Sequence, residues 1–519
     1  MSLHNETRNE ARNEARNETT KVSVVLRQAG PRAALIWFAV YVLVCLTGQR
    51  FNTEYLNFGW QLIPWDILST DPIRSVFYLH IQPPLWNLLL GTTAWMSPFS
   101  DRLTLQALMA MIGIAVVWLA AVLARRLGLS RNTAVVVALI ATLHPEVFKG
   151  AFEPTYELAT AGLLLLVLIA VADLSRKEKV RRSLIILASA VTVTALTRSL
   201  FHPVWAILIV MFGLWLMRHR INWKSAILVL SIPVIFMCGW MAKNQVVFGH
   251  ATLSSWFGMN MQRAVIPVLP KDDLDEMYAK GQISDIAMIG PFGKYELYED
   301  VVEPCVPEHN FRALTELTRT TDQWSPNFNA ECFLPIFDQA GKDAIAVIKE
   351  HPEAWLEGRL WSLRTTIAVS PIPSESKSEV MVGLDRVFSI ARLDFGGILS
   401  TEGWGTPIYG QLEARADFGL MLIPMYVMVG LLGLWHIIQR LRRKALSSTA
   451  PIYLVGSFTV AFTVIVGAIA ELGEQSRFRT MVDPIVTVMF LALVLPVVQR
   501  LYRQIRKSDN QSHAEAVGK

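Results

Sequence analysis

The sequence predicts an all-α polytopic membrane protein, and three observations support this fold class. The 519 residues are 52% hydrophobic and only 18% charged, with a mean hydropathy of +0.37. The apolar residues gather in blocks, and about 20 residues at a rise of about 1.5 Å each suffice to cross a hydrocarbon core. Basic residues recur at alternate gaps between these blocks, as expected where loops face the cytoplasm.

We expect about 10 transmembrane helices. Several apolar blocks are shorter than a full span, so their helices must extend into the flanking residues. The blocks are 34–48, 103–124, 132–144, 156–173, 183–197, 203–217, 225–243, 417–438, 452–470 and 481–500. A further apolar piece, 84–97, is short and follows Pro83-Pro84. We expect a re-entrant or surface-lying helix there, and about 11 spans result if it crosses.

Positive charge sets the orientation. With a cytoplasmic N-terminus, the inside loops are those that carry basic runs. These runs include Arg125-Arg126, Arg181-Arg182, Arg440 to Lys444 and Arg500 to Lys507. Both termini are then cytoplasmic. The net charge of +5 reflects these loops, so no nucleic-acid partner is expected.

The chain divides into several parts. Residues 1–33 are predicted to be a disordered cytoplasmic tail, because their repeated Asn, Glu, Thr, Ala and Arg units are too poor in apolar residues to fold. The other parts are a first membrane block (34–243) with the first outer loop (49–102), a periplasmic insertion (244–416), a second membrane block (417–507) and a cytoplasmic tail (508–519).

The insertion is too long to be a structureless connection. Apolar residues recur at helical spacing along 343–364 and are interrupted at Pro352, which predicts a small, mainly helical domain on the membrane surface. Cys305 and Cys332 fall in the same insertion. In an oxidising compartment they could form a disulfide, although two cysteines of one loop need not approach each other.

Ionisable and polar residues gather at the outer ends of the predicted spans. Such groups are costly near a membrane and usually face a polar cavity, so we expect one outward-facing cavity built from several segments. The residues of this one-sided collection are Asp66, Asp71, His80, Gln82, His144, Glu146, Lys149, Glu153, Tyr156, Glu157, Arg198, His202, Lys243, Asn244, Glu471, Glu474, Arg477 and Arg479.

These residue types suit one kind of chemistry. Arginine binds phosphate in bidentate fashion and stays charged in any surroundings, whereas a carboxylate can accept a proton or bind sugar hydroxyls. A lipid-phosphate leaving group needs charge stabilisation but no acid, and the attacking hydroxyl needs a base. A site that holds both residue types at a bilayer edge therefore favours a lipid-phosphate sugar donor.

Several short motifs occur in a fixed order on this side of the membrane. They are an acidic residue in the first outer loop, His80-x-Gln82-Pro-Pro-Leu85, Arg125-Arg126-Leu-Gly128, Pro145 followed by Glu157, Lys243-Asn244-x-x-x-Phe248-Gly249 before Ser254-Ser255, and Glu474-x-x-Arg477-x-Arg479 before Pro484. This order resembles the GT-C superfamily of integral-membrane glycosyltransferases, in particular bacterial aminoarabinose transferases and protein O-mannosyltransferases. The resemblance covers most of both membrane blocks and scarcely touches 265–400.

The resemblance implies a GT-C-like fold and an inverting transfer from a polyprenyl-phosphate donor, with a first-loop acidic residue as the base. That role falls on Asp66. The family usually has an Asp-Glu pair close after the first span, whereas this chain has Thr53-Glu54, so Asp71 and Glu54 remain competitors. Where the family has a second Asp this chain has Glu157, and Glu153 lies four residues earlier, so we expect both on one helix face.

The resemblance further implies that Arg477 or Arg479 contacts the donor phosphate, with Arg198 and Lys243 in support. His80, Gln82, Glu153, Glu157, Glu474 and Asn244 are then candidates for substrate binding. Simpler roles compete: His80 could only hold the first loop, Asp71 before Pro72 could only start a helix, and the two arginines could only reach for the interface. Some relatives hold a divalent metal, but we expect none here.

The residues and the resemblance together lead us to expect a glycosyltransferase of a bacterial inner membrane that is active on the periplasmic face. It would move a sugar from a polyprenyl-phosphate donor to an envelope lipid, polysaccharide or protein. Two alternatives stay open. A transporter or flippase would also need a polar cavity, but it more often shows internal repeats and midplane charges. A non-catalytic GT-C-like scaffold of the envelope is the other alternative.

Overall fold

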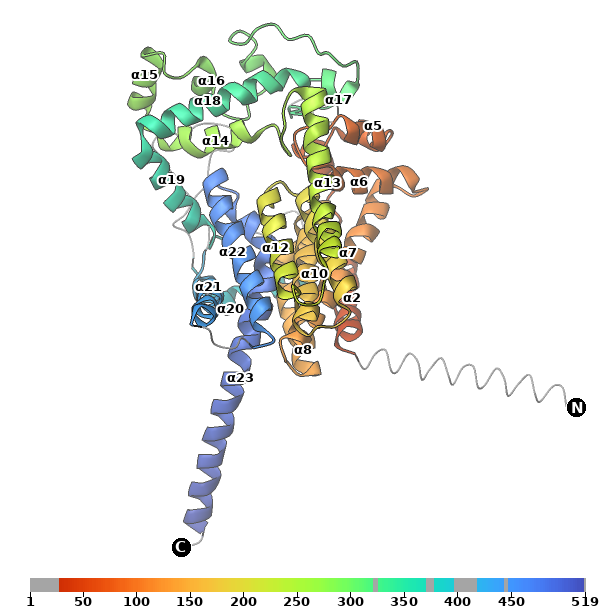
Figure 1. Cartoon of the computed structure of the whole chain (residues 1–519), viewed down its shortest axis with the longest axis vertical. Coiled ribbons are helices and arrows are strands. Elements are labelled where there is room, and N and C mark those ends of the chain that lie inside the picture. The colour runs from red at the N-terminus through yellow and green to blue at the C-terminus, as the bar shows by residue number, and fades with distance from the viewer. Residues whose placement is uncertain (1–27, 321–324, 370–377, 396–417, 443–446, 518–519) are drawn as a thin grey trace, which may run out of the picture.

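The computed structural model describes residues 28–320, 325–369, 378–395, 418–442 and 447–517. Its long helices form an upright bundle, and shorter helices form a layer across the upper end of that bundle (Figure 1). We call this layer, residues 250–365, the cap. The last helix projects from the lower end of the bundle (Figure 1).

Eight of the described helices are long and apolar enough to cross a membrane, which confirms the predicted polytopic helical class. They are α2 (Ala29–Leu46), α7 (Asp101–Arg126), α10 (Glu157–Ser175), α11 (Val180–Thr197), α13 (Trp223–Phe248), α21 (Leu422–Leu441), α22 (Ala450–Ala470) and α23 (Gln475–Val517). Helix α2 takes in the end of the predicted tail 1–33, of which residues 1–27 lie outside the described part. Helix α23 continues through most of the predicted tail 508–519.

Every predicted span coincides with a helix, but two of these helices are too short to cross alone. Helix α8 (Arg131–Leu143) ends before Pro145, because a proline disfavours the helical conformation of the residue that precedes it. The chain turns there by 70° into α9 (Pro145–Phe148) and η1 (Lys149–Ala151), and this bent pair gives a ninth candidate span. Helix α12 (Pro203–Leu216) has only 14 residues, so by length and composition the described residues contain eight candidate spans, or nine with the bent pair.

The first outer loop folds into short helices beside the cap. These are α3 (Glu54–Phe58), α4 (Trp65–Leu68), α5 (Pro72–Phe77) and α6 (Pro84–Met96). Helix α6 begins with Pro84 at its first position, where proline costs no hydrogen bond. It runs across the bundle (Figure 1) and is not among the candidate spans, in agreement with the prediction for 84–97.

The cap consists mainly of helices, as predicted for the insertion. They are α14 (Phe257–Val265), η2 (Ile266–Val268), α15 (Lys271–Ala279), α16 (Asp285–Ile289), η3 (Tyr295–Leu297), α17 (Arg312–Thr315), η4 (Glu331–Phe333), α18 (Leu334–Glu350) and α19 (Pro352–Thr365). The interruption expected at Pro352 separates α18 from α19. Cys305 and Cys332 form a disulfide with Cα atoms 5.6 Å apart.

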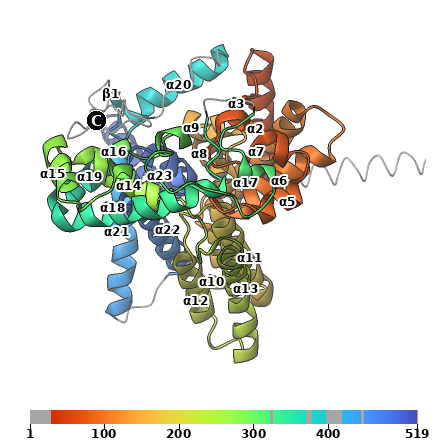
Figure 2. The same cartoon turned by 90° about the horizontal axis from the view of Figure 1, so that it is seen from above.

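The rest of the insertion lies apart from the cap. Helix α20 (Glu379–Arg392) is followed by the short antiparallel strands β1 (Asp394–Phe395) and β2 (Phe418–Gly419). Viewed from above, α20 lies at the edge of the molecule opposite α12 and α13 (Figure 2). Its N-terminus contacts the end of α2, where the Ser378 and Thr47 hydroxyls lie 2.5 Å apart.

Candidate functional site

A cavity of about 510 Å³ lies where the bundle meets the cap. Its apolar side is formed by α12, α13, α14 and α22, through Val204, Met241, Phe257, Phe462 and Val466. Trp60, Trp256 and Phe292 add aromatic rings. Its polar side includes Gln61, Gln82, Arg198, Arg263, Glu471 and Glu474. The cavity is thus amphipathic, and its charges come from segments far apart in the sequence.

Arg198 is the least compensated charge of this cavity. It directly follows α11 and is 6% exposed. Its guanidinium carbon lies 4.7 Å from the centroid of the Tyr156 ring and 5.1 Å from that of Phe478. Its Nε is buried without a hydrogen-bond partner, and no carboxylate in the described chain forms an ion pair with it. A buried charge without a counter-ion is costly, so this arginine is suited to an anionic ligand.

The two cavity glutamates lie on the tight loop between α22 and α23. Gly473 has φ +100° there, a conformation that side chains rarely adopt. Helix α19 supports the loop: Ser362 donates to the Glu471 carbonyl at 3.1 Å, and Arg359 donates to the last carbonyls of α22 at 2.7 and 2.8 Å. These bonds satisfy groups that a helix end leaves without partners and fix the backbone of Glu471.

Glu471 and Glu474 differ in their electrostatic surroundings. Burial raises the pKa of Glu471 to about 7, against the opposing effect of Arg263, whose Nη1 lies 3.4 Å from Oε1. Burial would also raise the pKa of Glu474, but the positive charges of Arg477, Arg263 and Arg198 outweigh it and hold that pKa below its usual value. Glu474 is therefore ionised near neutral pH, whereas Glu471 titrates there.

Arg477 lies behind the polar side of the cavity and is fully engaged. It forms an ion pair with Glu157 and lies 3.5 Å from Glu474. Its Nη2 donates to Gln61 at 2.9 Å and to the Tyr156 hydroxyl at 3.1 Å. The first loop, α10 and α23 thus meet at this one guanidinium, which organises the wall of the cavity.

The expectation that Glu153 and Glu157 share a helix face is wrong. Helix α10 begins only at Glu157, because Pro154 disfavours the helical conformation of Glu153. Glu157 is buried and bound to Arg477. Burial raises the pKa of Glu153, and Lys149 opposes that effect. Glu153 is not among the described residues that line the cavity.

The two polar residues of the His80-x-Gln82 motif have different roles. His80 is buried between Asn329 of the cap and Ser255, with Nε2 at 2.9 Å from the Asn329 carbonyl and Nδ1 at 2.6 Å from the Ser255 hydroxyl. Burial lowers the pKa of His80 to about 3, so the ring is neutral; Nε2 donates and Nδ1 accepts. His80 therefore joins the first loop to the cap.

Gln82, two residues later, is different. It is 3% exposed and lines the cavity. Its amide oxygen and nitrogen both lack a hydrogen-bond partner among the described residues. A buried amide that is left unsatisfied is costly, and a polar ligand in the cavity would satisfy it.

The acidic residues predicted in the first loop lie elsewhere. Asp66 is at the start of α4 and forms an ion pair with Arg312 of α17 at 2.8 Å. Asp71 caps α5, since its side chain accepts from the Arg74 backbone N–H at 3.2 Å. Glu54 is exposed at the start of α3. None of the three is among the described residues that line the cavity.

Lys243 and Asn244 hold neighbouring backbone. Lys243 Nζ donates to the Leu79 carbonyl at 2.8 Å and lies 3.7 Å from the centroid of the Trp240 ring. Asn244 donates to the Thr252 carbonyl at 2.7 Å. Both residues lie near the end of α13, and they fix the loop that follows it and its contact with the first outer loop.

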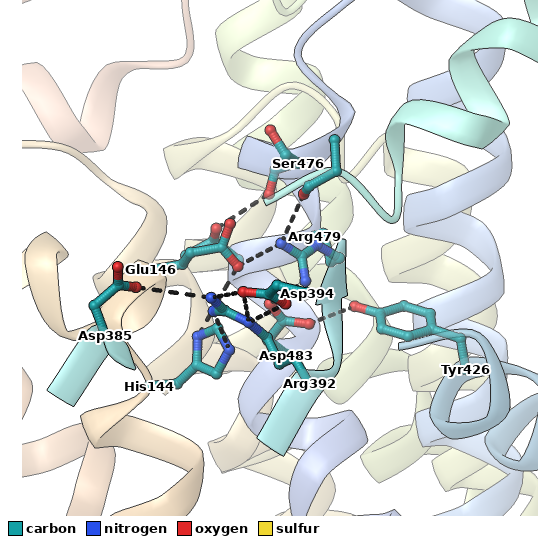
Figure 3. Close-up of polar contacts among 11 residues, drawn as sticks. His144, Glu146, Asp385, Arg392, Asp394, Tyr426, Ser476, Arg479 and Asp483 are labelled. Atoms are coloured by element: carbon teal, nitrogen blue, oxygen red, sulfur yellow. Dashed lines mark hydrogen bonds and ion pairs between the residues drawn. The ribbon is translucent and has the colours of Figure 1, made fainter. Parts of the chain in front are cut away.

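Arg479 does not join Arg477. It lies in a second polar cluster formed by α9, α20, α21, α23 and β1 (Figure 3). It forms an ion pair with Glu146, lies 3.4 Å from Asp483 and donates to the Ala368 carbonyl at 3.1 Å. Arg392 binds Asp394 and His144 in the same cluster. We call these residues the Arg479 network: His144, Glu146, Asp385, Arg392, Asp394, Tyr426, Ser476, Arg479 and Asp483.

The site also contains residues that the sequence analysis did not select. Arg263 and Trp256 lie in or beside α14, where the chain shows no motif. Tyr55 and Gln61 follow Glu54 but are not acidic, so a search for a base passes over them. Within the described ranges, no group of three or more His, Cys, Asp or Glu could hold a metal ion.

The sequence matches no family model and no curated protein. Several solved structures match. The oligosaccharyltransferase of Archaeoglobus fulgidus in its apo form is 14% identical with a TM-score of 0.38, over 92% of this chain and 52% of that one. The same organism's AglB, in complex with an inhibitory peptide and a dolichol-phosphate, is 12% identical with a TM-score of 0.33, over 91% and 52%.

ArnT from Cupriavidus metallidurans bound to undecaprenyl phosphate is 12% identical with a TM-score of 0.30, over 84% of this chain and 77% of that one. The chain thus spans about half the length of the oligosaccharyltransferases it matches. These proteins are GT-C superfamily membrane glycosyltransferases, the superfamily that the sequence motifs resemble. Identities and TM-scores this low carry no residue role and no activity to this chain.

Proposed function

We propose that this protein is a membrane glycosyltransferase that takes a sugar from a polyprenyl-phosphate donor and transfers it to an acceptor of the cell envelope. The environment of Arg198 is the observation that supports this proposal most. This residue is a buried guanidinium that forms no ion pair with a described carboxylate, and it opens on a cavity whose other side is apolar. An anionic lipid headgroup would form such an ion pair, and its chain suits the apolar side.

The composition of the cavity fits the parts of such a donor. The apolar residues of α12, α13 and α22 would contact the prenyl chain, and Arg198 would bind the phosphate. The Gln82 amide and the rings of Trp60 and Trp256 would then lie along the sugar. A few placed polar groups among apolar and aromatic side chains are typical of small-molecule sites.

The reaction would be a direct displacement at the anomeric carbon. The acceptor hydroxyl forms the new bond to that carbon, the bond to the phosphate oxygen breaks, and its electron pair leaves with the lipid phosphate. Arg198 would stabilise the charge that develops on the phosphate. The lipid leaving group needs no proton, so the only proton to be removed is that of the acceptor.

We place the cap on the periplasmic side of a bacterial inner membrane and both termini in the cytoplasm. The distribution of positive charge supports this orientation. Helix α7 begins beside the first outer loop and ends with Arg125 and Arg126, and further basic residues follow α10 and α12 at the same end of the bundle. The acceptor would be an envelope lipid, polysaccharide or protein reached from that side.

The proposal is tested by the binding of undecaprenyl phosphate to the purified protein. Arg198→Gln should weaken binding about ten- to a hundredfold, since hydrogen bonds to charged groups contribute about 1.5–3 kcal/mol. Arg198→Lys should retain part of the affinity. Arg220→Gln, an exposed arginine at the other end of the bundle, is the matched control and should bind normally.

The companion measurement is mass spectrometry of envelope glycans from cells that lack the protein and are complemented with either form. The wild type should restore a missing sugar and Arg198→Gln should not. Unchanged binding by Arg198→Gln, together with unchanged glycans in cells without the protein, would refute the proposal and favour a transporter or a scaffold.

A further inference from the structure

The cavity itself narrows the choice of base. Its lining includes two carboxylates among the residues that the structure describes, Glu471 and Glu474. Asp66 is bound to Arg312 beside α17 and does not line it. A general base must come within hydrogen-bond reach of the proton it removes. For a reaction inside this cavity, the candidate bases are therefore Glu471 and Glu474.

Glu474 is poorly suited to this task. It lies 3.5 Å from Arg477 Nη1, and the surrounding positive charges hold its pKa below the usual value. A carboxylate whose charge is stabilised in this way accepts a proton only weakly. Glu474 instead balances the charge of Arg477 and so preserves the wall that Tyr156 and Glu157 share.

Glu471 is held in a different way. Its Oε1 accepts from the Leu472 backbone N–H at 3.0 Å and lies 3.4 Å from Arg263. No hydrogen bond joins its Oε2 to a residue of the described chain. Oε1 therefore orients the carboxylate, and Oε2 can accept a hydrogen bond from a ligand. Gln82 has a buried amide without a partner among the described residues, lines the same cavity and points independently to a polar ligand there.

We infer that Glu471 is the proton acceptor of the transfer reaction and that Arg263 is its positioning residue. This inference rests on the proposed function. The acceptor is then a neutral nucleophile, a hydroxyl. Its proton passes to Glu471 Oε2 as the oxygen bonds to the anomeric carbon, and the lipid phosphate leaves with the electron pair of the broken bond. The proton afterwards passes from Glu471 to water.

The raised pKa of Glu471 supports this role and predicts a characteristic pH dependence of sugar transfer. Burial raises the pKa of Glu471 to about 7, close to the value that suits a base at neutral pH. The charged and titratable groups that face it are Arg263 from α14, Arg359 from α19, Glu474 from its own loop, and Arg198 and His202 from the loop between α11 and α12. Transfer should rise as pH increases through about 7, because only the ionised carboxylate accepts a proton.

The experiment compares sugar transfer and undecaprenyl phosphate binding in the same full-length variants. Glu471→Gln should lower transfer at least about a hundredfold, in the range of general-base catalysis, and leave binding within about twofold of the wild type. Glu471→Asp should retain part of the transfer. Glu353→Gln makes the same chemical change on a side chain that is 74% exposed, and it should transfer normally.

Arg263→Gln separates positioning from simple packing. Loss of its charge should raise the pKa of Glu471 further, so the rise of transfer with pH should move to higher pH. If Glu471→Gln fails to fold, the Glu471→Asp and Arg263→Gln profiles decide. Two results would overturn the inference while the wild type still transfers sugar. One is full transfer by Glu471→Gln. The other is a loss of transfer in Asp66→Asn but not in the Glu471 variants. A wild type that neither binds the lipid phosphate nor transfers sugar would overturn the proposed function and this inference with it.

Discussion

Two buried polar regions of this protein treat their charges in opposite ways. On the cavity wall, Arg198 forms no ion pair with a described carboxylate and Glu471 Oε2 makes no hydrogen bond to a described residue, beside a space of about 510 Å³. In the Arg479 network, Arg479 and Arg392 are each bound to carboxylates. The small pocket beside Arg479 has no room for a water molecule. Incomplete compensation beside a cavity indicates ligand binding, whereas mutual compensation without space indicates a structural role.

Helix α23 separates the two regions over a single turn. Arg477 and Arg479 are two residues apart, and residues at this spacing do not share a helix face. Arg477 therefore turns to Glu157 and the cavity wall, while Arg479 turns to Glu146 and α20. The network ties α20 and the strand pair to the same helix whose first turn supports the cavity.

The largest effect on stability is expected from the Arg479 network. Arg479→Gln removes one member of a buried ion pair and should lower the free energy of unfolding by about 3–5 kcal/mol, because Glu146 and Asp483 would keep an uncompensated charge. Denaturant unfolding in detergent micelles measures this. Arg198→Gln in the same assay should lower stability by less than about 1 kcal/mol or raise it, since it removes a charge without a counter-ion.

The double variant Glu146→Gln/Arg479→Gln sharpens this contrast. Its loss of stability should be smaller than the sum of the two single losses, because the partners are removed together. Equal losses from Arg198→Gln and Arg479→Gln would erase the distinction between the two regions.

The next largest effect on stability is expected from protonation of His80 at low pH. His80 belongs to neither polar region but fixes the first loop to the cap. Its folded-state pKa of about 3 lies below the ordinary histidine pKa of 6.5. The unfolded chain therefore binds the proton first, and stability falls as pH drops below 6.5. By pH 4.5 the loss from this residue should reach about 2–3 kcal/mol.

His80→Gln isolates this contribution, since Lys243 and His250 nearby remain in both proteins. Unfolding measured from pH 7 to pH 4.5 should show a shallower decline in the variant than in the wild type. Identical slopes would mean that the ring does not stay neutral in the folded protein.

The fold could be predicted much further than the site. Long apolar blocks and one-sided basic residues are constraints that the bilayer imposes on any sequence, so each predicted span has a helix. The number of crossings was less secure, because the bend at Pro145 and the short helix that starts at Pro203 depend on local proline geometry. The role of Arg263 could not be read at all, since α14 approaches Glu471 only through the tertiary fold.

Within the site, the order of residues along the chain is a poorer guide to their roles than their helical spacing. The resemblance assigns the donor phosphate to Arg477 or Arg479, although their spacing already places them on different sides of a helix. Asp66 was favoured by its place in the first loop, but the packing of α4 against α17 gives it Arg312 as a partner. Arg198 was named among the phosphate contacts, and its lack of a counter-ion could come only from the structure.

A smaller effect is expected from Gln82, which tests the cavity side of the comparison. Gln82→Leu removes a buried amide that has no partner among the described residues, so the protein should not lose stability. If a polar ligand forms a hydrogen bond with this amide, the substitution should weaken binding of that ligand by about 0.5–1.5 kcal/mol, that is, about two- to tenfold. Titration of the variant with undecaprenyl phosphate alone and with the natural donor shows whether the contact is to the phosphate or to the sugar.

The smallest effect is expected from Asp71, an exposed helix cap that contacts neither polar region. Asp71→Ala should lower the free energy of unfolding by about 0.5–1 kcal/mol, the lower part of the range for capping residues. Asp71→Asn should be nearly neutral, because asparagine caps about as well. A matching loss in both variants would show that the negative charge matters more than the hydrogen bond to the Arg74 backbone.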